Sequence, residues 1–446
     1  MRLHPLLLVL LSVPAAALTL DDAVAQALSN SKAGQLAHLK EMEAAAGLDR
    51  AQRERFPTVT AFGTVAYVPN PYQVKLGANS LTSLLDSTAN KVGLGYFNDI
   101  IGPFPPSDLT LMSGSRDVTI GGILLLQPLT QQWRIGSGIT AARADQEASL
   151  REEFKANAQI RFSVEEIFTG LLVEGSRHAA LEAKLAFKEA QLSDALHSKS
   201  VGELLDDSVL GLQAERTQCV AALTRNDQLC RRMGLQLGDL IGRPGAAVTD
   251  LDGALPERAT RTLDQWLADV AKNPDRQIAM ALIDKASAGL RASRQAEIPD
   301  LALFATGYSQ DGIGLLPTNS AIVGVVLKWD LLDFGRRRAD IQRSLIQRRE
   351  AEVSRDRTEE QAALQVRLAY QDLTYAGDLM KLGEQARTYR LRSAQLASQN
   401  VENGLALNSH FLAAQADLRE AEADLLDARM RRHLALLQLY LLTGEL

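Results

Sequence analysis

VGELLDDSVLGLQA at residues 201–214 and NGLALNSHFLAAQA at residues 403–416 are the two stretches that decide the fold. Each has glycine in second place, leucine in tenth place and Gln-Ala at its end, so the two align with a shift of 202 residues. The same shift places LQL at 235–237 on LQL at 437–439. A constant shift over this length indicates that one structural unit occurs twice in the chain.

The two halves also begin alike. TLD at residues 19–21 recurs at 262–264, which needs a shift of about 242 residues rather than 202. The difference places an insertion of about 40 residues in the first half, between Tyr67 and Val118. We expect this insertion to be an exposed loop or lid that joins two strands, or a disordered decoration.

The chain begins with the pattern of a secretory signal. Residues 1–17 contain an early arginine, an apolar run and small residues near the end, so we expect cleavage after Ala17 and export from the cytoplasm. The remaining chain divides into a first repeat at 18–242, a linker at 243–261 rich in Pro, Gly and Asp, and a second repeat at 262–446.

Proline is missing from two long blocks, residues 129–243 and 318–446. Interior proline costs a helix about 3 kcal/mol, so both blocks are free to form long helices. Leucines at four- and seven-residue spacing in the first block agree with a helical stripe. We predict two antiparallel coiled-coil helical hairpins, at residues 132–238 and 335–442.

Shorter helices precede the hairpins in each repeat. An outgoing helix of 68 residues is roughly 100 Å long, whereas a return helix of about 35 residues covers only half of it. Residues 32–55 and 275–297 are the segments that would pair with the remaining half of each outgoing helix. Thr19 and Thr262, each followed three residues later by Asp22 or Gln265, predict the capped start of a short helix in front of each segment.

Four short segments are candidate strands, at residues 57–68, 118–129, 299–309 and 322–332. They are rich in β-branched and aromatic residues, and their 11 or 12 residues suit a tilted strand that crosses a bilayer. Soluble hairpins have a similar pattern. Four strands alone leave unpaired edges, so strands that span a membrane would need further copies of the chain to close a barrel.

Composition and motifs exclude several functions. The chain has 48 basic and 54 acidic residues, so no basic field indicates nucleic-acid binding. Metalloprotease, nucleotide-binding and hydrolase motifs do not occur in the sequence, and we expect neither an enzyme nor a cofactor or metal centre. Cys219 and Cys230 are eleven residues apart on a predicted helix, too far to form a disulfide without breaking it.

The signal sequence, the opening TLDDAVAQAL at residue 19, the duplicated strand pairs and the turns at 201–202 and 404–405 together resemble the TolC family of outer-membrane efflux and secretion channels. The resemblance implies a mainly α fold with a small β part. The hairpins would form a periplasmic α-barrel, and the four strands would contribute to a trimeric 12-stranded transmembrane β-barrel. The linker at 243–261 would lie at the equator of the helical part.

The resemblance also implies a function. Such a protein is a passive outer-membrane exit duct of a tripartite efflux or type I secretion system, and exports small toxic molecules, metals or polypeptides. Its partners would be two further copies of itself, a periplasmic adaptor of the membrane-fusion type, an inner-membrane pump and outer-membrane lipid. The competing hypothesis is a soluble periplasmic coiled-coil adaptor or scaffold without a pore.

The family meets its adaptor at the helix turns of the periplasmic tip, although a plain helix-connecting turn would look the same. The matching positions here are Val201, Gly202, Glu203, Leu204, Asn403, Gly404 and Leu405. Asp206 and Asp207, just beyond the first turn, would form an acidic ring if three copies surround a narrow lumen, or a solvated helix end.

Relatives often carry carboxylates six residues after the tip glycine, where this chain has Ser208 and His410. The family's acidic gate therefore does not carry over directly, and His410 is either a titratable group or a packing residue. Aromatic residues near the strand ends suggest a membrane girdle. They are Tyr67, Tyr308, Trp133, Trp329 and Phe334.

Overall fold

The computed structural model describes residues 17–67, 69, 75–76, 109–110, 116–201, 204–253, 256, 258–312 and 317–446. The signal sequence, most of the insertion and the turn residues Gly202 and Glu203 lie outside this part. The chain forms two compact units. One contains the residues up to 39 with 151–277 and 357–446, and the other contains 40–150 and 278–356.

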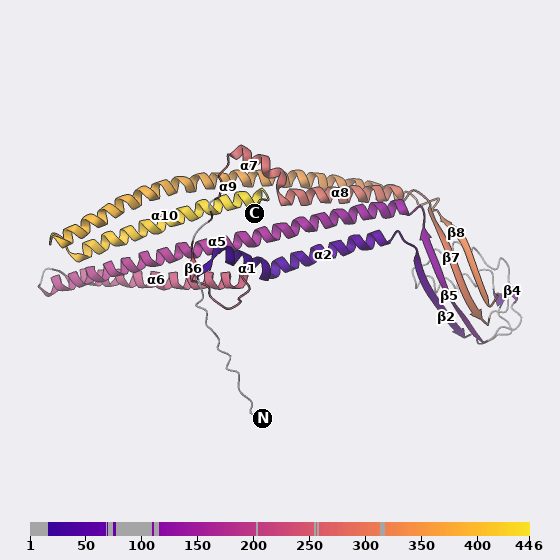
Figure 1. Cartoon of the computed structure of the whole chain (residues 1–446), viewed down its shortest axis with the longest axis horizontal. Coiled ribbons are helices and arrows are strands. Elements are labelled where there is room, and N and C mark those ends of the chain that lie inside the picture. The colour runs from indigo at the N-terminus through magenta and orange to yellow at the C-terminus, as the bar shows by residue number, and fades with distance from the viewer. Residues whose placement is uncertain are drawn as a thin grey trace, which may run out of the picture. The chain divides into compact units, whose positions relative to one another are not determined.

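Two long helical hairpins dominate the chain (Figure 1), as the proline-free blocks predicted. The first consists of α5 (Gln132–Ser200) and α6 (Asp206–Leu240). The second consists of α9 (Arg336–Glu402) and α10 (Asn408–Leu442). None of the helices in the described residues combines the length and the apolar character needed to cross a membrane.

Short helices precede both hairpins, and their starts are capped as the sequence predicted. The Thr19 side chain accepts a hydrogen bond from the Asp22 amide, and Thr262 and Gln265 form a full capping box. The elements are α1 (Leu20–Asn30), α2 (Lys32–Arg53), α7 (Leu263–Asp269), the 3₁₀ turn η3 (Val270–Lys272) and α8 (Pro274–Gln295).

The first unit contains two separate apolar cores. One is built by α1, α5 and α6 around the fully buried Phe168 and Leu237. The other is built by α7, α9 and α10 around the fully buried Trp266 and Leu439. Each repeat therefore buries its own hydrophobic face, as expected when one folding unit is duplicated.

Two very short strands hold the start of the chain against the linker, which the sequence did not predict. β1 (Leu18–Thr19) pairs in parallel with β6 (Leu251–Asp252). Within the insertion, β3 (Lys75–Leu76) pairs with β4 (Leu109–Thr110).

The second unit contains one four-stranded antiparallel sheet rather than two separate hairpins. Its strands are β2 (Thr58–Tyr67), β5 (Asp117–Pro128), β7 (Asp300–Asp311) and β8 (Asn319–Lys328), in the order β2-β5-β7-β8. The pairing of β5 with β7 joins the two repeats. This long-range pairing left no signal in the sequence.

The last strand ends at Lys328, four residues before the predicted end. The residues that follow turn sharply, with Phe334 at φ 52° and Gly335 at φ 90°. The Asp333 carboxylate accepts hydrogen bonds from the backbone N–H groups of Gly335 and Arg337. Residues 329–335 therefore form the cap that starts α9 and cannot continue the strand.

Each strand pair seats an aromatic ring over a glycine of its partner strand. Phe62 pairs with Gly122, and Phe304 pairs with Gly324 at the equivalent place in the second repeat. A Cβ on Gly122 would lie 2.8 Å from the Phe62 ring and 2.5 Å from the Gly307 carbonyl oxygen. Glycine is required there because the neighbouring backbone cannot yield.

We predict that Gly122→Ala destabilises the folded protein by about 1–3 kcal/mol, because the added methyl group overpacks the sheet. The measurement is thermal unfolding in detergent followed by circular dichroism. Gly63→Ala is the control, since only the Ile120 carbonyl oxygen lies near its Cβ position, at 4.0 Å. Equal unfolding temperatures for the two variants would contradict the close contact at Gly122.

Candidate functional site

The turn of the second hairpin is a complete Schellman motif. Gly404 has φ +72°, its N–H donates to the Val401 carbonyl, and the Leu405 N–H donates to the Asn400 carbonyl at 2.8 Å. Glycine adopts this left-handed conformation without a Cβ penalty, which explains its place at the end of α9. The turn exposes Asn403 and Leu405 to solvent.

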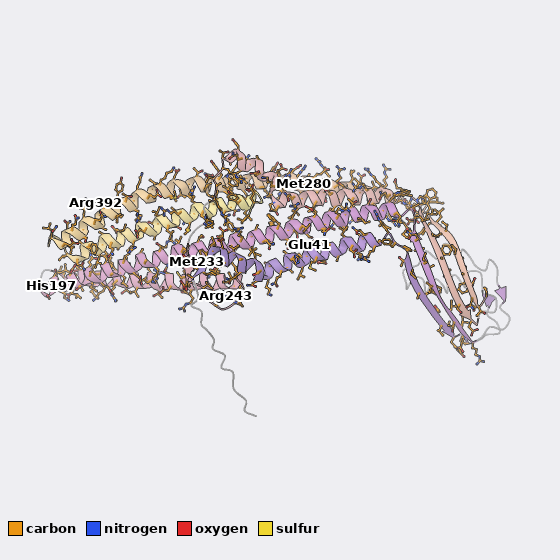
Figure 2. The ribbon with its side chains drawn as sticks, in the orientation of Figure 1. Glu41, His197, Met233, Arg243, Met280 and Arg392 are labelled. Carbon is orange, nitrogen blue, oxygen red and sulfur yellow. The ribbon has the colours of Figure 1, made fainter. Side chains whose placement is uncertain are left out.

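The turn of the first hairpin has fewer described residues. α5 ends at Ser200, Val201 is exposed and Leu204 is half-buried. His197 and Lys199 lie in the last turn of α5, and Figure 2 shows His197 at this end of the hairpin. The basic residues suit the negative end of the helix dipole.

Both return helices begin after an exposed leucine, a feature that the sequence reasoning missed. Leu205 and Leu407 occupy the N-cap positions of α6 and α10, and neither makes a side-chain cap hydrogen bond. Their exposed fractions are 75% and 64%. Leucine is a poor N-cap, and replacing a good cap by an apolar residue costs about 1 kcal/mol.

The same unfavourable choice occurs at equivalent positions of the two repeats, and Leu405 beside them is 76% exposed. The preference for a polar N-cap residue is thus broken at both equivalent positions. This makes the leucine side chains candidates for a functional contact. The available signal was an apolar residue directly before each return helix, where serine, threonine or aspartate is expected.

The four residues considered for a pore constriction are spread over two helix starts. Asp206 and Asp207 lie in the first turn of α6, where negative charge favours the helix dipole, and Ser208 follows them. Lys199 pairs with Asp206 at 2.6 Å, which neutralises one of the two carboxylates within the chain. His410 is exposed in the first turn of α10, which carries no acid.

The five aromatic residues of the predicted girdle lie on different faces and near different ends of the sheet. Tyr67 is exposed at the far end of β2, whereas Tyr308 lies on the opposite face, because it pairs with Gly122 and Ser320 and those residues alternate with the exposed ones. Tyr308 therefore does not share a face of the sheet with Tyr67. Three others are exposed near the end of the sheet where the helices begin: Trp133, Trp329 and Phe334.

A family model and several solved structures match the chain. The model of the outer membrane efflux protein family matches residues 270–445. The outer membrane protein VceC from Vibrio cholerae has a TM-score of 0.74 and 15% identity, and the match covers 95% of this chain and 96% of VceC. The chain has the fold of an outer-membrane efflux channel. The resemblance to TolC-type channels therefore holds for the fold of the chain.

Two further channels show the same fold. CmeC from Campylobacter jejuni has a TM-score of 0.74 and 13% identity, with 96% of this chain and 85% of CmeC covered. The open state of MtrE from Neisseria gonorrhoeae has a TM-score of 0.71 and 15% identity, with 95% and 88% covered. No curated protein sequence matches the chain. CmeC and MtrE are outer membrane channels, and the matched family is that of outer membrane efflux proteins.

We predict that Leu205→Ser and Leu407→Ser each stabilise the folded protein by about 1 kcal/mol, because serine supplies the missing N-cap hydrogen bond. Thermal unfolding measures this gain. Leu405→Ser is the control, since Leu405 is equally exposed but does not precede a helix as its N-cap. A loss of stability in both N-cap variants would show that the leucines pack within the hairpin turn.

Proposed function

We propose that the protein is a passive outer-membrane exit duct, assembled from three copies and opened by its partners. The observation that carries this proposal is the continuous apolar face of the sheet in the second unit. A sheet of a water-soluble protein covers such a face with other elements, whereas a sheet in lipid exposes it.

Most of the exposed apolar residues of the four strands point to one side of the sheet. The register pairs Val325 with Leu303, and Ile123 with both Ala61 and Gly307. The members of this lipid face are exposed by 38% to 78%: Val59, Val65, Ile123, Leu303, Val323, Val325 and Leu327. The opposite face carries threonine, glutamine and serine beside a small apolar cluster.

The sheet edges support assembly from several copies. In the described part of the chain, β2 pairs only with β5, and β8 pairs only with β7. Unpaired backbone groups in lipid cost several kcal/mol each, so the outer edges of β2 and β8 need partner strands. Three copies, each with four strands, would close a cylinder of twelve strands.

A second surface, on α9, also favours binding of a further copy of this chain. α9 buries one side against its own repeat through Ala362, Val366 and Leu373. A separate apolar stripe repeats every seven residues along α9, and its members are 44% to 73% exposed: Leu368, Tyr375, Leu382, Tyr389 and Leu396. A seven-residue apolar repeat is typical of a helix that packs lengthwise against another helix.

The exposed leucines at the hairpin turns support the contact with a periplasmic adaptor. Leu205, Leu405 and Leu407 present apolar side chains to solvent at helix starts and turns, at a cost to the helices. The signal sequence supports export to the cell envelope. Energy would come from an inner-membrane pump, and the cargo would be small toxic molecules, metals or polypeptides.

The decisive experiment is planar-bilayer conductance of the purified protein, together with native mass spectrometry in detergent. We expect stepwise conductance and a trimer, because the sheet has to close before it can span lipid. Replacing Asp206 and Asp207 by alanine tests whether these carboxylates set the cation preference. A monomer in the soluble periplasmic fraction without conductance would establish the competing function, a pore-free adaptor or scaffold.

We predict that Val323→Arg prevents stable insertion, because an arginine on the lipid side of a barrel strand costs about 2–4 kcal/mol near the middle of the bilayer. Val323 is 73% exposed on the lipid face. Ser320→Arg is the matched control on the opposite face of the same strand. The measurement is the amount of folded protein in outer-membrane fractions, and equal amounts for both variants would contradict the assigned faces.

We also predict that Leu205→Ser, Leu405→Ser and Leu407→Ser weaken adaptor binding while the trimer stays intact. The physical reason is the loss of apolar surface at the turns. Co-purification with the cognate adaptor measures binding, and Val220→Ser on α6 serves as an exposed apolar control away from the turn. Unchanged adaptor capture by all three turn variants would show that the adaptor binds elsewhere on the protein.

A further inference from the structure

The two repeats meet within the first unit along a seam that contains charged side chains. The apolar core of the first repeat belongs to α1, α5 and α6, and that of the second belongs to α7, α9 and α10. Between them, α5 and α10 face each other through charged residues, including Arg177 and Asp427 at 3.6 Å. Polar seams separate more readily than apolar cores because water replaces their contacts at little cost.

One carboxylate in this seam is almost completely buried. Glu165 of α5 is 1% exposed, and its two oxygens contact two arginines and a histidine from three parts of the chain. Arg258 of the linker lies at 2.7 Å, His433 Nε2 of α10 at 3.0 Å and Arg161 of α5 at 3.3 Å. α1 and α6 pack against the same stretch of α5 with apolar side chains.

The linker is held at this place by aromatic contacts as well. The Arg258 guanidinium lies 5.8 Å from the centre of the Tyr440 ring, and the Tyr440 hydroxyl donates to the Ala259 carbonyl. Arg261 lies over the rings of both Trp266 and Tyr440. Glu165 therefore connects the first hairpin, the linker and the last helix of the second hairpin.

Burial alone would raise the pKa of Glu165, but the hydrogen bond from His433 and the positive charge of Arg258 outweigh it and lower that pKa. The carboxylate is thus ionised in the folded protein at neutral pH. Losing one partner of such a buried ion pair leaves an uncompensated charge, which is far more costly than losing a surface pair.

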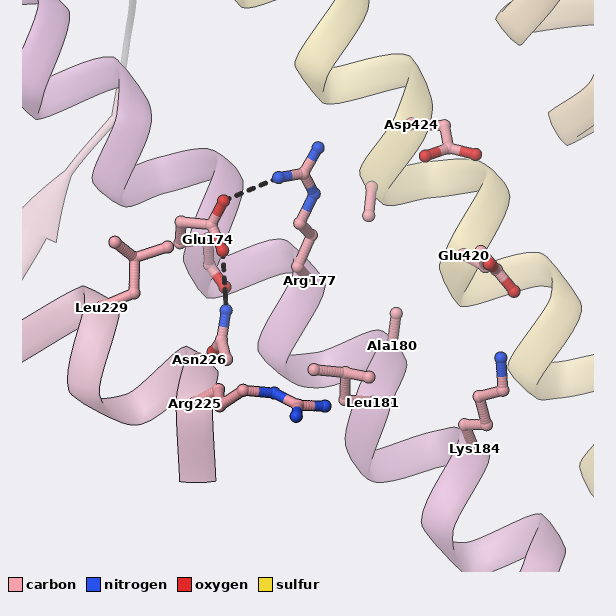
Figure 3. A pocket seen from close by; sticks show the side chains of 11 residues that line it. Glu174, Arg177, Ala180, Leu181, Lys184, Arg225, Asn226, Leu229, Glu420 and Asp424 are labelled. Atoms are coloured by element: carbon pink, nitrogen blue, oxygen red, sulfur yellow. Dashed lines mark hydrogen bonds and ion pairs between the residues drawn. The ribbon is translucent and has the colours of Figure 1, made fainter. Parts of the chain in front are cut away.

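The seam continues from Glu165 towards the hairpin turns as a cavity of about 350 Å³ (Figure 3). Arg177 and Lys184 of α5 line it on one side, and Glu420 and Asp424 of α10 line it on the other. Within the first hairpin, Glu174 binds Arg177 and Asn226 at 2.7 Å each. A cavity of this size with charged side chains in its wall admits water, so the hairpins are less tightly joined here than at Glu165.

We propose that Glu165 is the positioning residue that latches the second hairpin to the first, and that releasing it lets α10 and its turn move away from α5. This inference rests on the proposed duct, because such a movement at the hairpin turns would widen the passage. The ionic contacts of Glu165 hold the seam closed, and the water-accessible end near the cavity offers little resistance once they are released.

The latch has a defined pH dependence. The folded-state pKa of Glu165 lies below its ordinary value of 4.5, so its contribution is complete above that pH and is lost as the pH falls through the lower, folded-state value. The side chains that face the carboxylate are those of Arg161, Arg258 and His433. The arginines stay protonated throughout, so protonation of Glu165 itself releases the latch in acid.

The test measures the distance between spin labels on the exposed residues Glu182 of α5 and Arg419 of α10, with Cys219 and Cys230 replaced by alanine. The wild type should show one narrow distribution at pH 7 and a second, longer one only when the pH falls through the folded-state pKa of Glu165, which lies below 4.5. Glu165→Gln should show the longer distribution already at pH 7, and acid should add little to it.

Two comparison variants keep the result interpretable. Glu189→Gln removes a carboxylate that pairs with Arg216 on the surface of the first hairpin at 2.8 Å, and should behave like the wild type. The double variant Glu165→Gln with Arg258→Gln leaves no buried unpaired arginine, so it should fold even if the single variant does not, and should still show the longer distribution.

Channel recordings separate this inference from the proposed duct. Openings of the Glu165→Gln channel should be at least about tenfold more frequent than those of the wild type at pH 7, a shift of about 1.4 kcal/mol. If neither protein conducts but the distances change as expected, the duct is wrong and the latch stands. Distances and pH profiles identical to the wild type in both Glu165 variants would overturn the latch.

Discussion

The backbone groups along the outer edges of β2 and β8 have no partner strand in the described part of the chain. Four strands with one apolar face cannot satisfy these groups in lipid, and they cannot hide that face in water. The need for partner strands links the other features of the proposed duct. The seven-residue stripe on α9 gives the copies a lengthwise helical contact, and the internal duplication supplies two strand pairs and two hairpins per copy.

The hairpin turns show where stability and function oppose each other. Gly404 makes an ideal helix end, with the positive φ and both hydrogen bonds of a Schellman motif. Two residues later the chain places Leu407 at a position that favours a hydroxyl or a carboxylate, and Leu205 repeats this choice. α9 therefore has a favourable C-terminal cap, whereas α6 and α10 have unfavourable N-caps. Such N-caps are expected where the N-cap residue contacts a partner protein.

The seam between the hairpins has the opposite character. Glu165 is buried among charged groups whose positions depend on three distant segments, so the contact stabilises one arrangement of the two repeats rather than the protein as a whole. A purely apolar seam would bind the hairpins more firmly. A seam with charged contacts and a water-accessible cavity suits the proposed duct, because water can replace its contacts when the hairpins move apart.

Sequence alone determined the duplicated helical hairpins, the short capped helices and the approximate positions of four strands. These features follow from local rules, since proline exclusion, apolar spacing and capping residues act within a few turns of the chain. The end of β8 was misplaced because the residues after Lys328 are apolar enough for a strand, although Asp333 uses them to cap α9.

Only the tertiary structure decided which strands pair across the repeats, on which face of the sheet Tyr308 lies, and which groups contact Glu165. β5 and β7 pair across more than 170 residues of chain, and Glu165 lies 268 residues from His433. Such contacts have no local spacing or propensity to reveal them. They are set when separate elements pack together, because only then do buried charges and strand edges find the partners that satisfy them.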